Sequence, residues 1–183
     1  MTSMAVMPRA TEWTVDDLEH LPDDGLQYEL LDGILLVTPA PVPAHQAVAG
    51  ELYVRLRAAC PPHLKVFFAP LDWQPDRRTS LQPDLLVIPR DDIGLKNLTR
   101  PLALAVEVLS PSTWRKDQVL KYSKYADSDV GSYWIVDPTR PSIVAFDLVD
   151  ETYVEVARAQ GPGPFSVAKP YPVSFVPDDL LDL

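Results

Sequence analysis

Apolar residues recur along the chain with two different periods, which together predict a sheet flanked by helices. A spacing of four places Val48, Leu52 and Leu56 on one face of a helix expected over residues 45–59. A second helix is expected over residues 114–126, and a short one follows Thr14 and ends before Pro22. Short apolar runs bounded by turn residues predict strands at 28–31, 34–37, 65–69, 71–74, 85–88, 102–109, 132–136, 143–148 and 153–159.

The order of these elements predicts an α/β or α+β protein with a central sheet flanked by helices. Asp32-Gly33 between two apolar runs is a strong signal for an N-terminal hairpin. The strands after residue 132 suggest a C-terminal antiparallel meander, and the tail over 161–183 is rich in proline and weakly patterned. Residues 1–10 lack any pattern and are expected to form a flexible leader before a single domain over residues 11–183.

Two carboxylates stand where the pattern favours apolar residues. Asp84 directly precedes the run Leu85–Ile88, and Glu107 interrupts the run over residues 102–109. A carboxylate within an apolar strand is costly to bury unless it is paired, protonated or bound to a metal ion. Because a sequence that loses stability in this way usually does so at a functional site, this pair predicts a divalent-cation site.

The charge distribution changes what the acidic composition implies. A net charge of −10 argues against a nucleic-acid partner, because phosphates are bound by Lys and Arg. The acidic residues lie mainly in the flanks, however: residues 1–33 carry one basic and eight acidic side chains, and residues 141–183 carry two and seven. Residues 34–140 carry thirteen basic and eleven acidic side chains, so a local basic surface beside the carboxylates is compatible with the total.

Cysteine use and hydropathy predict the compartment. Cys60 is the single cysteine, which excludes an internal disulfide and favours a reducing interior. No run reaches the roughly 18 uninterrupted apolar residues that span a bilayer, and residues 1–13 contain no apolar signal core. We therefore expect a cytoplasmic protein without a membrane partner.

The carboxylates belong to a longer set of motifs that resembles a known family. These motifs extend over about residues 12–160 and comprise Tyr28-Glu29-Leu30-Leu31-Asp32-Gly33, His45-Gln46, Gln82-Pro83-Asp84, Glu107-Val108-Leu109-Ser110-Pro111-Ser112-Thr113, Asp117 with Lys121 and Tyr125, and Tyr133-Trp134-Ile135-Val136-Asp137-Pro138. They resemble the restriction-endonuclease-like superfamily with its PD-(D/E)xK signature, and within it the Uma-two family. The resemblance implies the restriction-endonuclease-like fold and a metal-dependent nuclease that hydrolyses phosphodiester bonds, with DNA as the expected substrate.

The resemblance implies a metal role for three carboxylates. Asp84 and Glu107 would ligate Mg²⁺, with Mn²⁺ as a substitute, and Glu29 would add a third carboxylate. One or two carboxylates with waters and substrate oxygens are the usual protein contribution to a Mg²⁺ site. For Glu29, a purely structural role in the hairpin beside Asp32 stays open.

The lysine of the signature departs from the usual superfamily pattern. Two residues after the glutamate, where lysine is usual, this chain has Leu109, and the matching lysine is Lys121 on the following helix. A lysine at such a centre can orient the attacking water or stabilise the phosphate charge. Lys121 could instead pair with Asp117 one turn away. Lys116 and Lys124 are alternative positions and candidate substrate contacts.

Other roles stay open for the remaining site residues. Asp84 could be a turn or capping residue, and Glu107 could pair with an arginine such as Arg100. His45 begins a helix, where a capping role competes with a phosphate contact, and Gln82 could give a polar supporting contact on the strand face of Asp84. Both are candidate substrate-binding residues.

Two function classes therefore stand side by side. The first is the Mg²⁺-dependent endonuclease, with nucleic acid as partner and a homodimer as the expected assembly. The second is a binding or assembly module, also dimeric, that retains the nuclease fold without catalysis and uses its acidic flanks against a basic partner. RNA or a smaller phosphodiester is an alternative substrate for the first class.

Overall fold

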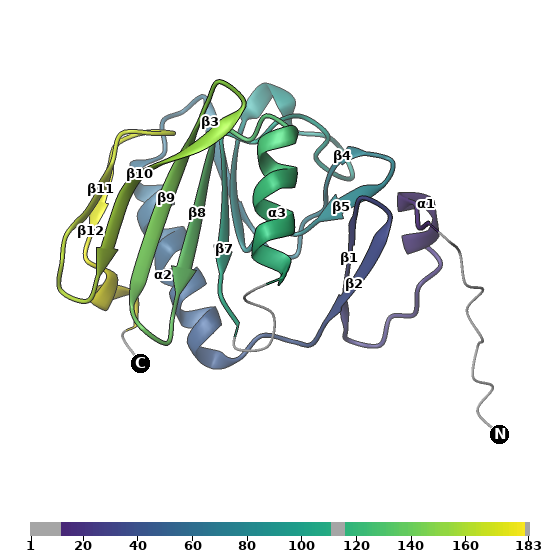
Figure 1. The fold of residues 1–183 in the computed structure, drawn as a ribbon, viewed down its shortest axis with the longest axis horizontal. Coiled ribbons are helices and arrows are strands. Elements are labelled where there is room, and N and C mark those ends of the chain that lie inside the picture. Colours follow the sequence, from purple (N-terminus) through teal and green to yellow (C-terminus); the bar gives the residue numbers. More distant parts are fainter. Residues whose placement is uncertain (1–11, 111–115, 182–183) are drawn as a thin grey trace.

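The computed structural model describes residues 12–110 and 116–181, with backbone alone for 116–118, and has the expected α+β architecture (Figure 1). Its helices are α1 (Val15–Leu18), α2 (Pro43–Ala59) and α3 (Lys116–Asp127), with the 3-10 turns η1 (Arg90–Asp92) and η2 (Pro177–Leu180). Its strands are β1 (Gln27–Leu31), β2 (Ile34–Thr38), β3 (Leu64–Phe68), β4 (Trp73–Asp76), β5 (Thr79–Leu81), β6 (Leu85–Pro89), β7 (Leu104–Val108), β8 (Ser132–Asp137), β9 (Ser142–Val149), β10 (Thr152–Gln160), β11 (Phe165–Val167) and β12 (Val173–Phe175).

A small sheet carries the N-terminal hairpin, with the strand order β2-β1-β5-β4. The predicted hairpin is confirmed, since β1 pairs antiparallel with β2 and Leu31 lies opposite Ile34. Both turn residues have positive φ, 50° for Asp32 and 84° for Gly33, as a type I′ turn requires. Arg78 donates to the Asp32 carbonyl at 2.9 Å and so closes the β4–β5 turn against this hairpin.

The large sheet has the strand order β10-β9-β8-β7-β6-β3, and its pairs are antiparallel except for β7 with β8. The one parallel pair follows from the connection through α3, because a parallel neighbour needs a crossover. The expected C-terminal meander is confirmed in β8, β9 and β10. The two strands that follow Asp84 and contain Glu107, β6 and β7, are direct neighbours with Leu85 opposite Val106.

The two long helices cover opposite faces of the large sheet, so that β7 has an apolar layer on each side (Figure 1). On one face Val106, Val108 and Trp134 pack with the helical residues Val48, Leu52 and Leu56 of α2. On the other face Ala105 and Tyr133 pack with Tyr125 of α3 and with Trp73. Successive side chains of a strand alternate between its faces, so Glu107 points to the α3 side together with Ala105.

Several expectations are wrong in detail. The strand expected over 71–74 is β4 at Trp73–Asp76, and β5 and the β11–β12 hairpin were not expected. Strands of three residues are too short to show a period. Helix α2 begins at Pro43, because proline fits the first helical position, and β7 begins at Leu104. Helix α3 is confirmed from Lys116 to Asp127, whereas its expected start at Trp114 and the leader over 1–10 lie outside the described residues.

No helix in the described part of the chain is long and apolar enough to cross a membrane. Cys60, at the C-cap of α2, is half-buried and free.

Candidate active site

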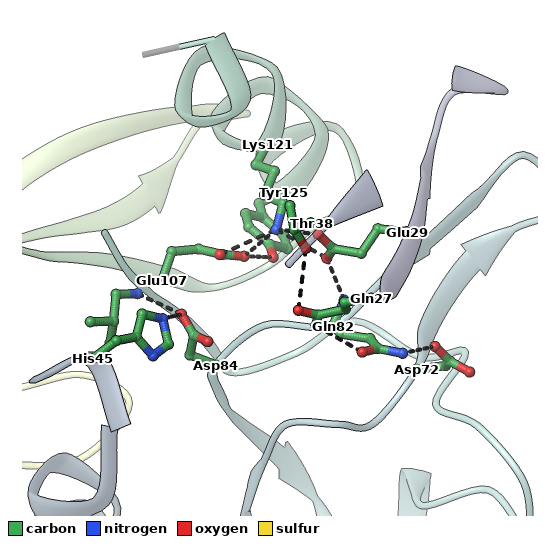
Figure 2. A network of polar contacts seen from close by, with 11 residues as sticks. Gln27, Glu29, Thr38, His45, Asp72, Gln82, Asp84, Glu107, Lys121 and Tyr125 are labelled. Atoms are coloured by element: carbon green, nitrogen blue, oxygen red, sulfur yellow. Dashed lines mark hydrogen bonds and ion pairs between the residues drawn. The ribbon is translucent and has the colours of Figure 1, made fainter. Parts of the chain in front are cut away.

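Four side chains that the sequence singled out meet where the two sheets approach each other (Figure 2). Glu29 comes from β1 of the small sheet, Asp84 precedes β6, Glu107 lies on β7, and Lys121 lies on α3. Extending the β6–β7 register by one residue beyond Leu85 and Val106 brings Asp84 opposite Glu107. The local strand pairing therefore explains why these two carboxylates share one end of the sheet.

Lys121 lies between two carboxylates. Its Nζ is 3.0 and 3.1 Å from the two oxygens of Glu29, and 3.1 and 3.2 Å from those of Glu107. The alternative that Glu107 pairs with an arginine is not what the structure shows, because its ion-pair partner is Lys121. The neighbouring carboxylates outweigh the desolvation of the ammonium and raise the pKa of Lys121, so this lysine stays charged at any physiological pH.

Glu107 has a second polar partner in Tyr125, one helical turn beyond Lys121. The hydroxyl of Tyr125 donates to Glu107 Oε1 at 2.6 Å. Burial raises the pKa of Glu107 to about 7, with Asp84 and Glu29 adding to the increase and Lys121 and Tyr125 opposing it. Near neutral pH, Glu107 can therefore exist in either protonation state, and a further positive charge nearby would favour the ionised one.

Asp84 is held from two sides. Its Oδ2 accepts a hydrogen bond from the backbone N–H of Val108 at 2.7 Å and lies 3.2 Å from Nε2 of His45. Although burial opposes it, the pairing with Asp84 raises the pKa of His45 above its ordinary value. Among the residues that the structure describes, the other ring nitrogen of His45, Nδ1, is buried without a hydrogen-bond partner. The neutral tautomer with the proton on Nε2 leaves no buried N–H unpaired.

A second polar chain supports Glu29. The backbone N–H of Gln82 donates to Glu29 Oε1 at 2.8 Å. The side-chain amide of Gln82 is fixed at both ends: it donates to Asp72 Oδ1 at 2.9 Å and accepts from Gln27 Nε2 at 2.8 Å. Gln82 thus supports the site through its backbone and joins β1 to the loop before β4.

These groups line a single cavity of about 870 Å³. Its wall also contains apolar and proline residues from several segments of the chain, among them Leu18, Leu21, Pro22, Leu26, Pro39, Pro41, Val42, Pro70 and Leu109. The polar side chains are recessed, with exposed fractions of 6% for Glu29, 9% for Lys121 and 18% for Asp84. Electrostatic interactions at this depth are screened less than at the surface.

Lys124, which the sequence offers as an alternative to Lys121, is not part of this arrangement. Lys124 pairs with Asp32 and Asp76, each at 2.7 Å, and lines a separate depression of about 300 Å³. The side chains of Lys116 and Asp117 lie outside what the structure describes, so their predicted contacts stay predictions.

Sequence reasoning missed several residues that complete the site. Gln27 and Asp72 were not expected to take part, because they come from separate segments and follow no shared spacing. Tyr125 follows Lys121 by four residues on α3, and this spacing is the sequence signal for its contact with Glu107. Tyr133 and Trp134 are buried in the core.

The donor set suits a hard divalent cation. Asp84 and Glu107 offer carboxylate oxygens to one cavity, and two carboxylates suffice for Mg²⁺ when waters and substrate oxygens complete the octahedron. Within residues 12–110 and 116–181, no three His, Cys, Asp or Glu side chains are grouped so that they could hold a metal ion together. Asp84 lies opposite Glu107 in the extended β6–β7 register and both line the cavity, so this pair suits a single cation.

Comparison with known proteins agrees with the motifs and the fold. A crystal structure described as a putative nuclease belonging to DUF820, from Anabaena variabilis ATCC 29413, is similar with a TM-score of 0.75 and 17% identity over 92% of this chain and 97% of that one. No curated protein matches significantly. The family model Uma2, described as "Putative restriction endonuclease", matches residues 15–177. The match extends over most of the described structure and includes all four clustered side chains, and the chain therefore belongs to the Uma2 family.

Proposed function

We propose that this protein is a Mg²⁺-dependent endonuclease that hydrolyses phosphodiester bonds in DNA. The observation that carries the proposal is the Lys121 ammonium held 3.1 Å from Glu107, in the same cavity as Asp84. A lysine beside two cavity-facing carboxylates is the arrangement that metal-assisted phosphodiester hydrolysis needs. The family description supports this reaction class.

The residues have distinct roles in this proposal. Asp84 and Glu107 hold the Mg²⁺, for which Mn²⁺ can substitute, whereas Glu29 as a third ligand is an expectation from the sequence motifs alone. When bound, the cation supplies positive charge to the phosphate and increases the acidity of a water molecule. Lys121 orients the attacking water or stabilises the charge on the phosphate.

The groups around Asp84 act on its orientation. His45 and the N–H of Val108 both contact Oδ2, so the carboxylate keeps one rotamer with its other oxygen turned away from these donors. His45 and Gln82 remain candidates for substrate contact because both line the cavity. A homodimer in the cytoplasm is the expected state of the active protein.

Replacing Asp84 with asparagine tests the catalytic proposal. We expect the parent protein to nick supercoiled plasmid with Mg²⁺ or Mn²⁺ and not with EDTA. Asp84→Asn should lower the rate by about 100-fold or more, because the loss of one ligand weakens the binding of the cation and changes its position. The matched control is Asp91→Asn, at an exposed position in η1. Equal nicking by all three proteins would indicate a contaminating nuclease and contradict the proposal.

One observation favours the second candidate, a non-catalytic binding or assembly module. All four carboxylate oxygens nearest Lys121 lie within 3.2 Å of its Nζ, so this lysine already has a structural function within the fold. The net charge of −10 suits a basic protein partner. Calorimetric titration with Mn²⁺ separates the two, because a module of this kind has no need to bind the cation.

A further inference from the structure

Glu29 differs from Asp84 in what it contacts and from Glu107 in where it lies. Glu107 also contacts Lys121 with both oxygens, at 3.1 and 3.2 Å, but it lies opposite Asp84 in the extended β6–β7 register, whereas Glu29 lies on β1 of the small sheet. Its two oxygens lie 3.0 and 3.1 Å from Lys121 Nζ, and Oε1 also accepts the N–H of Gln82 at 2.8 Å. The described side-chain contacts of Asp84 are instead with His45 and with the backbone N–H of Val108. Figure 2 shows Asp84 beside His45 and away from Glu29. Glu29 is thus directed at the ammonium and Asp84 is not.

We propose that Glu29 is a positioning residue that fixes Lys121 and does not ligate the cation. This inference rests on the proposed function above. It assigns the two carboxylates of the large sheet, Asp84 and Glu107, to the cation, and the one carboxylate of the small sheet to the lysine. Lys121 is then the link between the two groups, since Glu107 contacts it from the opposite side at 3.1 Å.

The surroundings of Glu29 are built to hold it in place. The side chain of Glu29 is only 6% exposed, and it accepts a hydrogen bond from the backbone N–H of Gln82. The side-chain amide of Gln82 is in turn held by hydrogen bonds with Gln27 and Asp72. A carboxylate whose lone pairs are committed to fixed donors has few orientations left. Glu29 therefore holds the ammonium of Lys121 at a fixed distance from β1. Helix α3 places Lys121 within reach of Glu29.

Transferring Glu29 to a cation would disturb this arrangement. Lys121 as a whole residue is 7% exposed. Without Glu29, its buried ammonium would keep Glu107 as its one carboxylate partner among the described residues. Glu107 already holds the cation in this proposal, so the buried ammonium would keep a single carboxylate whose charge the cation also neutralises. Breaking one side of a buried charge cluster is strongly unfavourable, so the geometry favours Glu29 remaining with Lys121 when the cation binds.

The test compares cation affinity with turnover. Three proteins are compared: the parent, Glu29→Gln and Asp84→Asn. Calorimetry measures their Mn²⁺ affinity, and cleavage of an oligonucleotide duplex measures their kinetics. We expect Glu29→Gln to bind Mn²⁺ within about tenfold of the parent, and Asp84→Asn to lose about 100-fold or more. In Glu29→Gln we expect kcat to fall by about 100-fold with little change in KM, as when a charge-stabilising group is misplaced. Glu51→Gln, at a half-buried position of α2 outside the cavity lining, is the matched control.

A second readout does not depend on activity. A buried, ion-paired lysine ammonium exchanges its protons slowly, so the ¹H–¹⁵N signal of Lys121 should be visible in the parent. Its absence in Lys121→Met assigns the signal. In Glu29→Gln we expect the signal to be lost or broadened. Glu29→Asp should not restore either the signal or kcat, because its carboxylate is one methylene too short. A loss of Mn²⁺ affinity in Glu29→Gln as large as that in Asp84→Asn would overturn the inference while leaving the nuclease intact. If neither the parent nor any variant cleaves DNA, the proposed function fails. The Mn²⁺ affinities and the ammonium signal still test whether Glu29 holds Lys121 or binds the cation.

Discussion

Replacing Lys121 with methionine should abolish cleavage and lower the free energy of unfolding by about 3–5 kcal/mol at pH 8, the usual cost of breaking a buried ion pair. Methionine retains the length of the side chain but removes the ammonium that separates Glu29 from Glu107. Two buried carboxylates would then face each other without a cation between them. At pH 6 the loss should be smaller, because Glu107 can take up a proton.

The matched control for this variant lies on the same helix. Lys124→Met also removes a mostly buried ammonium with two carboxylate partners, but Asp32 and Asp76 are 62% and 43% exposed. Water can solvate both partners after the change, so the expected loss is about 1 kcal/mol or less. Urea denaturation of both variants measures the difference. Equal stability losses for Lys121→Met and Lys124→Met, or cleavage by Lys121→Met at the parent rate, would contradict the role given to Lys121.

In the metal-free protein, stability should fall as pH rises from about 5 to 8, with most of the change due to Glu107. The pKa of Glu107 is 4.5 in a solvated chain and about 7 in the fold. Between these values the folded state holds a proton that the unfolded state has released, so the fold is favoured at the lower pH. Above the folded pKa, the destabilising contribution of Glu107 is complete and no longer changes.

Other groups contribute differently over this range. His45, whose pKa is raised above 6.5, also contributes stability at low pH that is lost as pH rises. The raised pKa of Lys121 affects stability only in the alkaline range, above 10.5. Exposed carboxylates such as Asp17, whose pKa is lowered by hydrogen bonds with Thr14, act only below their ordinary range.

Thermal melting at a series of pH values, in the parent and in Glu107→Gln, measures this dependence. The variant has no carboxyl at this position to titrate, so the slope of Tm against pH should shrink to the part due to His45. Saturating Mn²⁺ should reverse the parent's slope, because cation binding competes with the proton on Glu107 and is strongest at high pH. A parent whose Tm rises from pH 5 to 8 without metal would contradict the electrostatic account of Glu107.

The sequence predicted the pair of carboxylates well because their relation is local in the sheet. Asp84 and Glu107 lie at the same end of the antiparallel β6–β7 pair, and the alternation of β7 sends Glu107 to the face opposite Val106 and Val108. The apolar runs alone indicated both strands. Hydrophobic period, hairpin turn and helix spacing likewise predicted most elements of the fold.

The polar network around the carboxylates could not be predicted in the same way. Glu29 and Lys121 lie 92 residues apart, and neither spacing nor charge pattern indicates that their side chains meet. The support from Gln82 comes through its backbone N–H, which every residue except proline carries. Long-range pairing and backbone donation depend on how the two sheets pack, and this packing has no local signature in the sequence.

The location of a bound cation tests the central claim most directly. Crystals grown with Mn²⁺ and measured at the manganese absorption edge would show its position by anomalous scattering. We predict one strong peak in the cavity, ligated by one or both oxygens of Asp84 and of Glu107, with Glu29 still paired with Lys121. A cavity without a peak at saturating Mn²⁺, or a peak away from Asp84 and Glu107, would contradict the claim that these carboxylates form the cation site of a nuclease.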